Sequence, residues 1–256
     1  MKIVTYNING IRASSNKGIV KWLGDFDADI YAIQEVRADN NTALSILYDS
    51  ILNNVRDYEV ILNPSARAGY SGTAILCKKA PNHYSFGFDG EDVEGRLITA
   101  YFDDFVLVNC YVPNGGTRLD FKMEYYEKLT NYLTDLKNKY KNIIFCSDSN
   151  IAHTENDVSN PSEAITKTGF LPLEQQAFSN LLSFGFVDSY REIHGKEKAY
   201  TWRSYKEILY KQSGMKYRFD YIITNIELQQ KLKESNILDL PFSDHLPVAN
   251  DYDFDL

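Results

Sequence analysis

The feature of this sequence that most limits its fold is the alternation of short apolar, β-rich runs with segments of helical periodicity. Runs rich in valine, isoleucine and tyrosine predict strands at residues 3–8, 30–36, 58–62, 73–78, 143–146 and 221–224. Two further runs, 97–102 and 105–112, are joined through Asp103-Asp104 and predict a hairpin. Hairpin strands with helices between the others indicate an α/β protein with mixed sheets covered by helices.

The clearest helix is predicted at residues 118–140, where large apolar side chains recur every three or four positions. These are Phe121, Tyr125, Leu129, Tyr132, Leu136 and Tyr140, and we interpret them as a face packed on the core. Further helices are predicted at 17–26, 42–55, 173–184 and 228–235. Because we find no internal repeat or Pro/Gly/Ser linker, we expect a single domain over residues 1–256.

Composition limits where the chain works. The sequence contains no run of about 18 apolar residues, so we expect no membrane span. The N-terminal stretch reaches the polar Asn7 and Asn9 too early for a signal peptide. The three cysteines are not in a CxxC pair and lie in apolar runs, which predicts buried reduced thiols rather than a disulfide framework or a zinc site. We therefore expect an intracellular monomer, cytoplasmic if the organism is bacterial.

Net charge alone argues mildly against a nucleic-acid partner. The formal charge is −8 and the pI is near 5.1, whereas nucleic-acid binders usually carry a basic footprint. Net charge does not fix how charges are distributed, because a metal-binding enzyme concentrates carboxylates and can still carry a local basic stripe.

Polar side chains interrupt the sequence where predicted strands begin or end. The five places are Asn7 in Tyr6-Asn7-Ile8-Asn9-Gly10, Gln34-Glu35, Asp148-Ser149-Asn150, Arg218-Phe219-Asp220-Tyr221 and Ser243-Asp244-His245. Each alone is also ordinary turn or strand-end chemistry. Together they supply the hard oxygen ligands that Mg²⁺ prefers, and Mn²⁺ could substitute for it.

The same residues suit hydrolysis of a phosphodiester. Asp148 and Asn150 are two positions apart, so in a strand they point to the same side. A histidine such as His245 has its orientation fixed and its pKa raised when it pairs with a carboxylate, for which Asp220 is the candidate. A metal, a carboxylate-held water and an imidazole together predict a phosphodiesterase. The chain lacks a Gly-x-Ser-x-Gly elbow and a Walker-type phosphate loop.

Taken in order, the motifs resemble those of the exonuclease III and abasic (AP) endonuclease family. They are TYNINGIR, IQEVR, GYSGTAILCK, EGRLITAYF, NCYVPNGG, CSDSNIAH, GFLPLEQQ, VDSYR, YTWRSY, RFDYIIT and SDHLPV, and they cover nearly the whole chain. The resemblance implies a four-layered α/β sandwich with two mixed β-sheets packed face to face and flanked by helices.

The resemblance also implies roles for individual residues. The implied catalytic residues are Tyr111, Asp148, Asn150, Asp220 and His245. The metal ligands and their neighbours would be Glu35, Asn7, Asp148, Asn150, Asp244 and His245. The substrate would contact Asn9, Arg37, Asn114, Trp202, Tyr217 and Phe219, with Phe242 a further aromatic candidate. The DNA backbone would meet Arg12, Arg37, Arg67, Arg96, Arg118 and Lys122.

The implied reaction is cleavage of double-stranded DNA 5′ to an abasic site, with action on damaged 3′ ends as exonuclease or 3′-phosphatase. An aromatic pocket that admits a sugar without a base would give this specificity. The sequence departs from the family pattern at Ser147, Arg203 and Tyr217, which flank the chemistry. Two alternatives stay open: a phosphatase of the same superfamily on a non-DNA substrate, and a DNA-binding protein that does not cut. Retention of Glu35 and His245 argues against the second.

Overall fold

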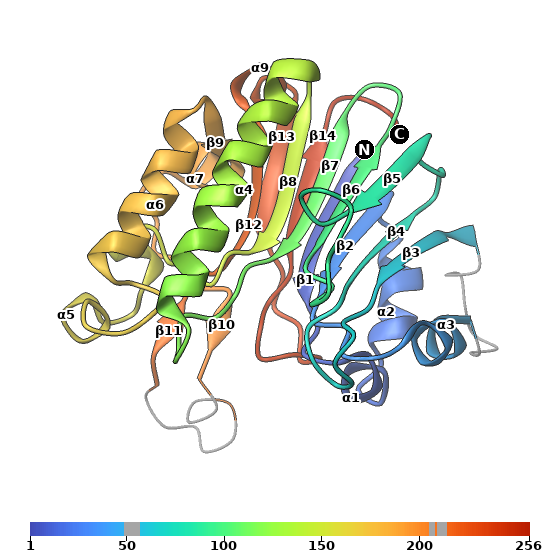
Figure 1. Ribbon diagram of the computed structural model, residues 1–256, viewed down its shortest axis with the longest axis horizontal. Helices are drawn as coiled ribbons and strands as arrows, with labels where there is room; N and C mark the ends of the chain where they lie inside the picture. Colours follow the sequence, from blue (N-terminus) through green and yellow to red (C-terminus); the bar gives the residue numbers. More distant parts are fainter. Residues whose placement is uncertain (49–56, 205–207, 209–213) are drawn as a thin grey trace.

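The strands form two six-stranded sheets and a two-stranded ribbon in the computed structural model, which describes residues 1–48, 57–204, 208 and 214–256 (Figure 1). Sheet A consists, in spatial order, of β13 (Leu232–Ile237), β14 (Val248–Tyr252), β1 (Lys2–Asn7), β2 (Ile30–Gln34), β4 (Thr73–Cys77) and β3 (Glu59–Asn63). Sheet B consists of β5 (His83–Phe86), β6 (Leu97–Tyr101), β7 (Val106–Tyr111), β8 (Ile143–Asp148), β12 (Asp220–Asn225) and β9 (Phe186–Asp188). The ribbon pairs β10 (Trp202–Arg203) with β11 (Lys216–Tyr217).

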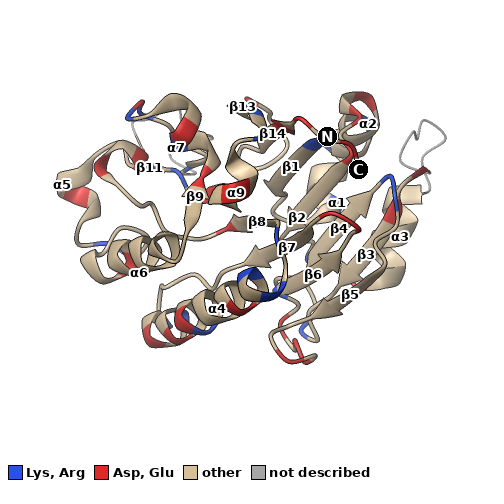
Figure 2. Cartoon of the chain, turned by 90° about the horizontal axis from the view of Figure 1, so that it is seen from above, with Lys and Arg blue, Asp and Glu red and all other residues tan. Residues whose placement is uncertain are grey.

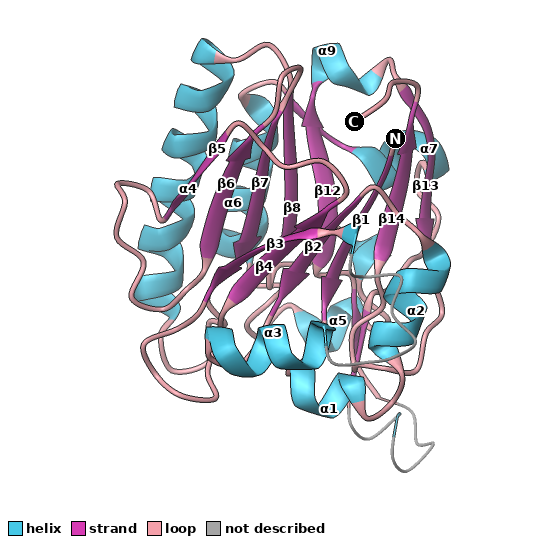
Figure 3. Cartoon of the chain, turned by 90° about the vertical axis from the view of Figure 1, so that its right-hand side faces the viewer, coloured by secondary structure: helices cyan, strands magenta, loops and turns pink. Residues whose placement is uncertain are grey.

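The sheets pack face to face between two layers of helices. Helices α1 (Ile11–Ser15), α2 (Ile19–Phe26) and α3 (Asn40–Tyr48) lie on the outer side of sheet A (Figures 1 and 3). Helices α4 (Leu119–Lys139) and α6 (Pro172–Ser183) cover sheet B. Between the sheets lies an aliphatic core that includes Ile3, Ile75, Ile144 and Ile222. The predicted four-layered α/β sandwich is confirmed.

Strand direction brings the ends of several strands to one edge of the sandwich. In sheet A, β1 runs parallel to β2, and in sheet B, β7 runs parallel to β8. Strands β12 and β14 are antiparallel to these neighbours, so their first residues lie beside the last residues of β8 and β1. Central strands such as β2 and β8 are buried along their whole length, because a helix layer covers one face and the other sheet covers the second.

Most predicted elements are present, and one is wrong. The predicted helix at 228–235 is a short α9 (Ile226–Gln229) followed by strand β13. The polar, helix-forming residues there suggested a helix, but pairing with β14 overrides that propensity, and an edge strand tolerates a polar outer face. Strands β5, β9, β10, β11 and β14 were not predicted. Of the helix predicted at 42–55, residues 49–55 lie outside the described part of the chain.

Helix α4 has the predicted extent but a rotated buried face. Its buried residues are Lys122, Tyr126, Leu129, Leu133 and Leu136, so only two of the six predicted positions are fully covered. The aromatic side chains at 121, 125 and 132 are partly buried at the margin of this face, and Tyr140 is exposed. A charged lysine, Lys122, thus lies at the N-terminal end of the buried stripe.

Two further short helices lie on the sheet B side, α5 (Pro161–Ala164) and α7 (Ser189–His194). Seen from the end that carries the termini, acidic residues occur on α4, α6, α7 and α9 (Figure 2). No helix in the described part of the chain is long and apolar enough to span a bilayer. All three cysteines are free and buried, as predicted.

Candidate active site

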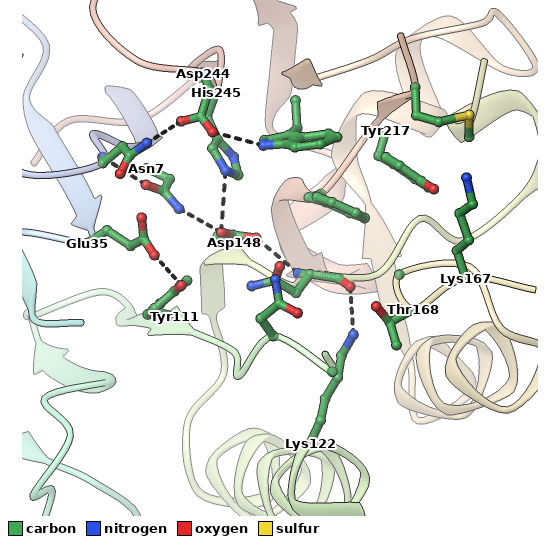
Figure 4. Close-up of a pocket in the computed structure, with 18 of the residues that line it drawn as sticks. Asn7, Glu35, Tyr111, Lys122, Asp148, Lys167, Thr168, Tyr217, Asp244 and His245 are labelled. Atoms are coloured by element: carbon green, nitrogen blue, oxygen red, sulfur yellow. Dashed lines mark hydrogen bonds and ion pairs between the residues drawn. The ribbon is translucent and has the colours of Figure 1, made fainter. Parts of the chain in front are cut away.

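The candidate site lies where the strand ends of the two sheets meet. Asn7 ends β1, Tyr111 ends β7, Asp148 ends β8, Glu35 follows β2, and His245 lies in the loop before β14 (Figure 4). These side chains line a pocket of about 680 Å³. The pocket also contains the other predicted residues Asn9, Arg37, Asn114, Asn150, Trp202, Tyr217, Phe219 and Asp244. Asp220 is buried behind His245 rather than lining the pocket.

The backbone around the pocket is unusually constrained. Asn9, Glu35, Arg37 and Asn150 all have positive φ angles, between 49° and 55°. Asparagine adopts this region readily, whereas glutamate and arginine do so at a cost. Backbone hydrogen bonds maintain the conformation: the N–H of Gly10 donates to the Glu35 carbonyl at 2.8 Å. Strained, over-determined backbone of this kind is typical of a pre-organised site.

Asp148 lies at the centre of the hydrogen-bond network. Asn7 Nδ2 donates to Asp148 Oδ2 at 2.7 Å, and the Asn150 N–H donates to Asp148 Oδ1 at 3.0 Å. His245 Nε2 lies 3.9 Å from Asp148 Oδ2. Burial raises the pKa of Asp148 to about 7; the charge of Asp220 adds to the rise, while His245 and Asn7 oppose it. A carboxylate in this state is a much stronger base than one in water.

His245 is held as the predicted partner of Asp220. Its Nδ1 lies 2.8 Å from Asp220 Oδ2, and the pair is buried. Burial alone would lower the pKa of His245, but the carboxylates of Asp220 and Asp148 raise it to about 10. Nε2 is therefore a charged donor that faces the Asp148 carboxylate.

Glu35 lies on the sheet A wall of the pocket. It accepts a hydrogen bond from the Tyr111 hydroxyl, and Arg37 Nη2 donates to its Oε2 at 2.9 Å. Burial and the charge of Glu35 raise the pKa of Tyr111, so the phenol remains a donor. Arg96 Nη1 donates to the Tyr111 carbonyl at 3.0 Å from beneath.

Asp244 completes the acidic lining. Asn9 Nδ2 donates to its Oδ1 at 2.8 Å, and Trp202 Nε1 donates to its Oδ2 at 3.0 Å. Burial would raise the pKa of Asp244, but His245 and these two donors lower it. Asp244 therefore lines the pocket as an ionised carboxylate, and its hydrogen bond to Trp202 connects it to the β10–β11 ribbon.

The donor set fits a hard divalent cation. Asp148, Asp220 and His245 form a buried group whose ligand atoms lie within 4.8 Å of one another and could hold a metal ion. Glu35 and Asp244 add carboxylates, and Asn7 adds an amide. Oxygen ligands of this kind suit Mg²⁺. A bound cation would also relieve the repulsion between buried carboxylates that raises the Asp148 pKa.

Three aromatic rings form one wall of the pocket. Tyr217 and Phe219 are stacked, with ring centroids 4.8 Å apart, and Trp202 lies 5.7 Å and 6.0 Å from them. Phe242, the fourth aromatic candidate, was wrongly assigned: it does not line the pocket, and instead packs near Trp22 and the outer core of sheet A. Six lining residues were not identified as pocket residues, namely Gly115, Lys122, Lys167, Thr168, Gly169 and Met215. Gly115 and Gly169 lie within motifs that already marked their segments.

Two of the predicted DNA-backbone contacts are wrong. Arg96 is buried against Glu94, and Lys122 is buried against Glu174, so neither side chain is available at the surface. The remaining members of that set stay predictions.

Of the other histidines, His83 is exposed and His194 is half-buried. His153 is partly buried, and its Nε2 lies 2.8 Å from the Ser179 hydroxyl oxygen.

Comparison with known proteins agrees with the fold. The profile of the Endonuclease/Exonuclease/phosphatase family matches residues 4–245. An exodeoxyribonuclease of Bacillus subtilis (strain 168) is 34% identical, over 97% of this chain and 98% of its own length. The DNA repair nuclease APEX1 of Danio rerio is 34% identical, over 97% of this chain and 81% of its own. The structure of an AP endonuclease from Archaeoglobus fulgidus superposes with a TM-score of 0.86 at 28% identity, covering 99% of this chain and 100% of that one.

The chain therefore belongs to the Endonuclease/Exonuclease/phosphatase family, whose members are hydrolases. Within it, the chain belongs to the exonuclease III and AP endonuclease group.

Proposed function

We propose that this protein is a Mg²⁺-dependent DNA repair nuclease that hydrolyses the phosphodiester 5′ to abasic sites in duplex DNA. The same site would remove nucleotides or phosphate from damaged 3′ ends. The observation that carries the proposal is that one pocket is lined both by side-chain oxygens that can bind a metal ion and by an aromatic wall. The names of the relatives, an exodeoxyribonuclease and DNA repair nucleases, support it.

Asp148 is the residue best suited to orient and deprotonate the attacking water. Asn7 and the Asn150 N–H fix both of its oxygens, so its orientation does not depend on substrate. Its pKa of about 7 lies near neutral pH, and a general base is most effective when its pKa is close to the pH of the reaction.

His245 and Tyr111 are placed to stabilise charge on the phosphate. His245 is kept protonated and oriented by Asp220, so that Nε2 can donate to a phosphate oxygen. Tyr111 brings its hydroxyl to the opposite wall. Donors aimed from fixed positions at developing charge lower the barrier without reorganisation during the reaction.

Glu35 would hold Mg²⁺, with Asn7 and Asp244 beside it. When bound there, the cation would offset negative charge on the phosphate and on the leaving oxygen. The aromatic wall of Trp202, Tyr217 and Phe219 would receive a flipped sugar and exclude one that carries a base.

The proposal is tested with a labelled duplex that contains one abasic-site analogue, incubated with Mg²⁺ or with EDTA beside an undamaged duplex. We expect Mg²⁺-dependent incision 5′ to the lesion, before any digestion of the control. Incision of neither duplex, combined with hydrolysis of a simple phosphomonoester, would instead favour a phosphatase of the same family. A duplex with a 3′-phosphate tests the second activity.

Replacing Glu35 with glutamine is expected to raise the Mg²⁺ concentration for half-maximal activity by about 10 to 100-fold. The amide keeps one of the two acceptor oxygens that Tyr111 and Arg37 use but lacks the charge that attracts the cation. The measurement is the rate of incision against Mg²⁺ concentration, with Glu124→Gln on the exposed side of α4 as the matched control. An unchanged Mg²⁺ requirement in Glu35→Gln would remove Glu35 from the metal site.

We further propose that residues 1–256 form one catalytic domain that acts as an intracellular monomer. The three buried, free cysteines are in keeping with a reducing compartment.

A further inference from the structure

A fully buried ion pair lies directly behind the catalytic turn. Lys122 on α4 and Glu174 on α6 contact each other, and both side chains are 0% exposed. They come from helices that cover sheet B and are 52 positions apart in the sequence. Replacing such a pair by apolar side chains is often neutral or stabilising, so stability alone does not account for it.

The lysine end of the pair holds the catalytic turn. Lys122 Nζ donates to the Asn150 carbonyl at 2.7 Å (Figure 4). Asn150 has a φ of 49°, and its N–H donates to Asp148 Oδ1. Its Nδ2 donates to the Val112 carbonyl at 2.9 Å. The lysine therefore holds a residue whose N–H contacts the Asp148 carboxylate and whose side chain contacts Val112, directly after β7.

The glutamate end holds the segment behind the aromatic wall. Glu174 Oε2 accepts the N–H of Gly169 at 2.6 Å and of Leu171 at 3.0 Å. Gly169 has a φ of 95°, and a Cβ added there would lie 2.8 Å from Phe219 Cζ. The Gly169 carbonyl accepts the N–H of Ala152, two residues beyond Asn150. The glutamate thus sets how closely this segment approaches the Phe219 ring.

We propose that the Lys122–Glu174 pair is a positioning unit for the reaction, fixing the Asp148 turn and the aromatic wall relative to each other. The proposal rests on the proposed function, because its effect is measured on DNA cleavage. An error of about 1 Å in such a placement can cost about 100-fold in rate. Neither residue touches the reacting atoms in this role, since Lys122 acts through Asn150 and Glu174 acts through Gly169.

The test is the double variant Lys122→Met/Glu174→Gln in the full chain, with Lys128→Met on the exposed side of α4 as control. Methionine preserves the length of the stem, and glutamine retains an acceptor for the Gly169 and Leu171 N–H groups. The double variant therefore removes chiefly the bond to Asn150 without leaving a buried charge. We expect kcat to fall by about 10 to 100-fold and KM to change by less than roughly threefold.

A purely structural role predicts something different. It would lower kcat only in proportion to the unfolded fraction, and assays well below the melting temperature would restore the rate. Equal kcat in wild type and the folded double variant overturns the proposal, as does full recovery on cooling. If the double variant does not fold, Glu174→Gln alone decides, with an expected kcat loss of about threefold to tenfold. An inactive wild type would refute the proposed function instead, so the two failures are distinguishable.

Discussion

Replacing Asp148 with asparagine is expected to lower kcat for incision by about 10³ to 10⁴-fold while the melting temperature stays equal to or above that of wild type. Asparagine occupies the same space and can still accept one hydrogen bond, but it cannot take a proton from water. The rate is measured under single-turnover conditions at saturating Mg²⁺, so that product release does not mask the chemical step.

The stability half of this expectation follows from the raised pKa. Burial raises the pKa of Asp148 to about 7, above its value in an unfolded chain. The folded state therefore disfavours the ionised carboxylate, and this penalty grows as the pH rises through the interval between the two values. Removing the ionisable group relieves a penalty of order a few kcal/mol, partly offset because one oxygen acceptor is lost.

The matched control is Asp25→Asn, which removes a carboxylate from an exposed pair on α2. It is expected to leave kcat unchanged and to shift stability by less than about 0.5 kcal/mol. A kcat within tenfold of wild type in a folded Asp148→Asn protein would contradict the assignment of the base. Melting curves are recorded in EDTA, because a metal bound only to the native state would add its own stabilisation.

The residues of the pocket could be predicted because their positions follow from strand geometry. Asn7, Glu35 and Asp148 each end or follow an apolar run, and parallel strands bring such ends to a common edge. The pairing of β12 with β8 places Asp220 opposite Asp148, which explains why the carboxylate that opens a strand reaches His245. Local pattern marked these segments, whereas Tyr111, Asn114 and the aromatic residues were predicted from the family resemblance.

The parts that were predicted wrongly depend on distant contacts. From the sequence alone, Lys122 is expected to be a surface cation. It can be buried only because α6 packs beside α4 and brings Glu174 into contact with it. The buried face of α4 was misplaced for the same reason, since two apolar stripes overlap in its sequence and packing selects one. The residues of β13 favour a helix, but they form a strand because they pair with β14 at the edge of sheet A. None of these outcomes is encoded within a few neighbouring positions.

Beneath the aromatic wall lies a buried charge network, and replacing Arg218 with methionine is expected to destabilise the fold by about 3 to 5 kcal/mol. Arg218 Nε donates to Asp157 Oδ1 at 2.6 Å, and its terminal nitrogens donate to both oxygens of Asp188 at 2.6 and 3.1 Å. Without the guanidinium, Asp188 loses its buried cation, while Asp157 keeps only Arg191. Urea denaturation measures the loss, with Arg12→Met at the surface as the matched control.

Arg218→Lys separates charge from geometry. Lysine keeps the positive charge but lacks the planar fork that reaches two carboxylates at once, so we expect an intermediate loss of stability. Equal stability of Arg218→Lys and wild type would mean that charge alone matters. A loss for Arg218→Met no larger than that for Arg12→Met would show that the network is not needed for folding.

The destabilisation should also depend on pH in a defined direction. Burial alone would raise the pKa of Asp157, but Arg218 and Arg191 lower it to about 2. A folded-state pKa below the unfolded one means that Asp157 stabilises wild type at pH values above the unfolded pKa, and that this stabilisation disappears as the pH falls through about 2. In Arg218→Met, Asp157 loses one of the two arginines that lower its pKa, so it protonates at a higher pH than in wild type. The difference in unfolding free energy between wild type and Arg218→Met should therefore be largest near neutral pH and shrink toward a pH of about 4. A difference that stays constant or grows on acidification would assign the loss to packing of the arginine side chain against Tyr221 instead.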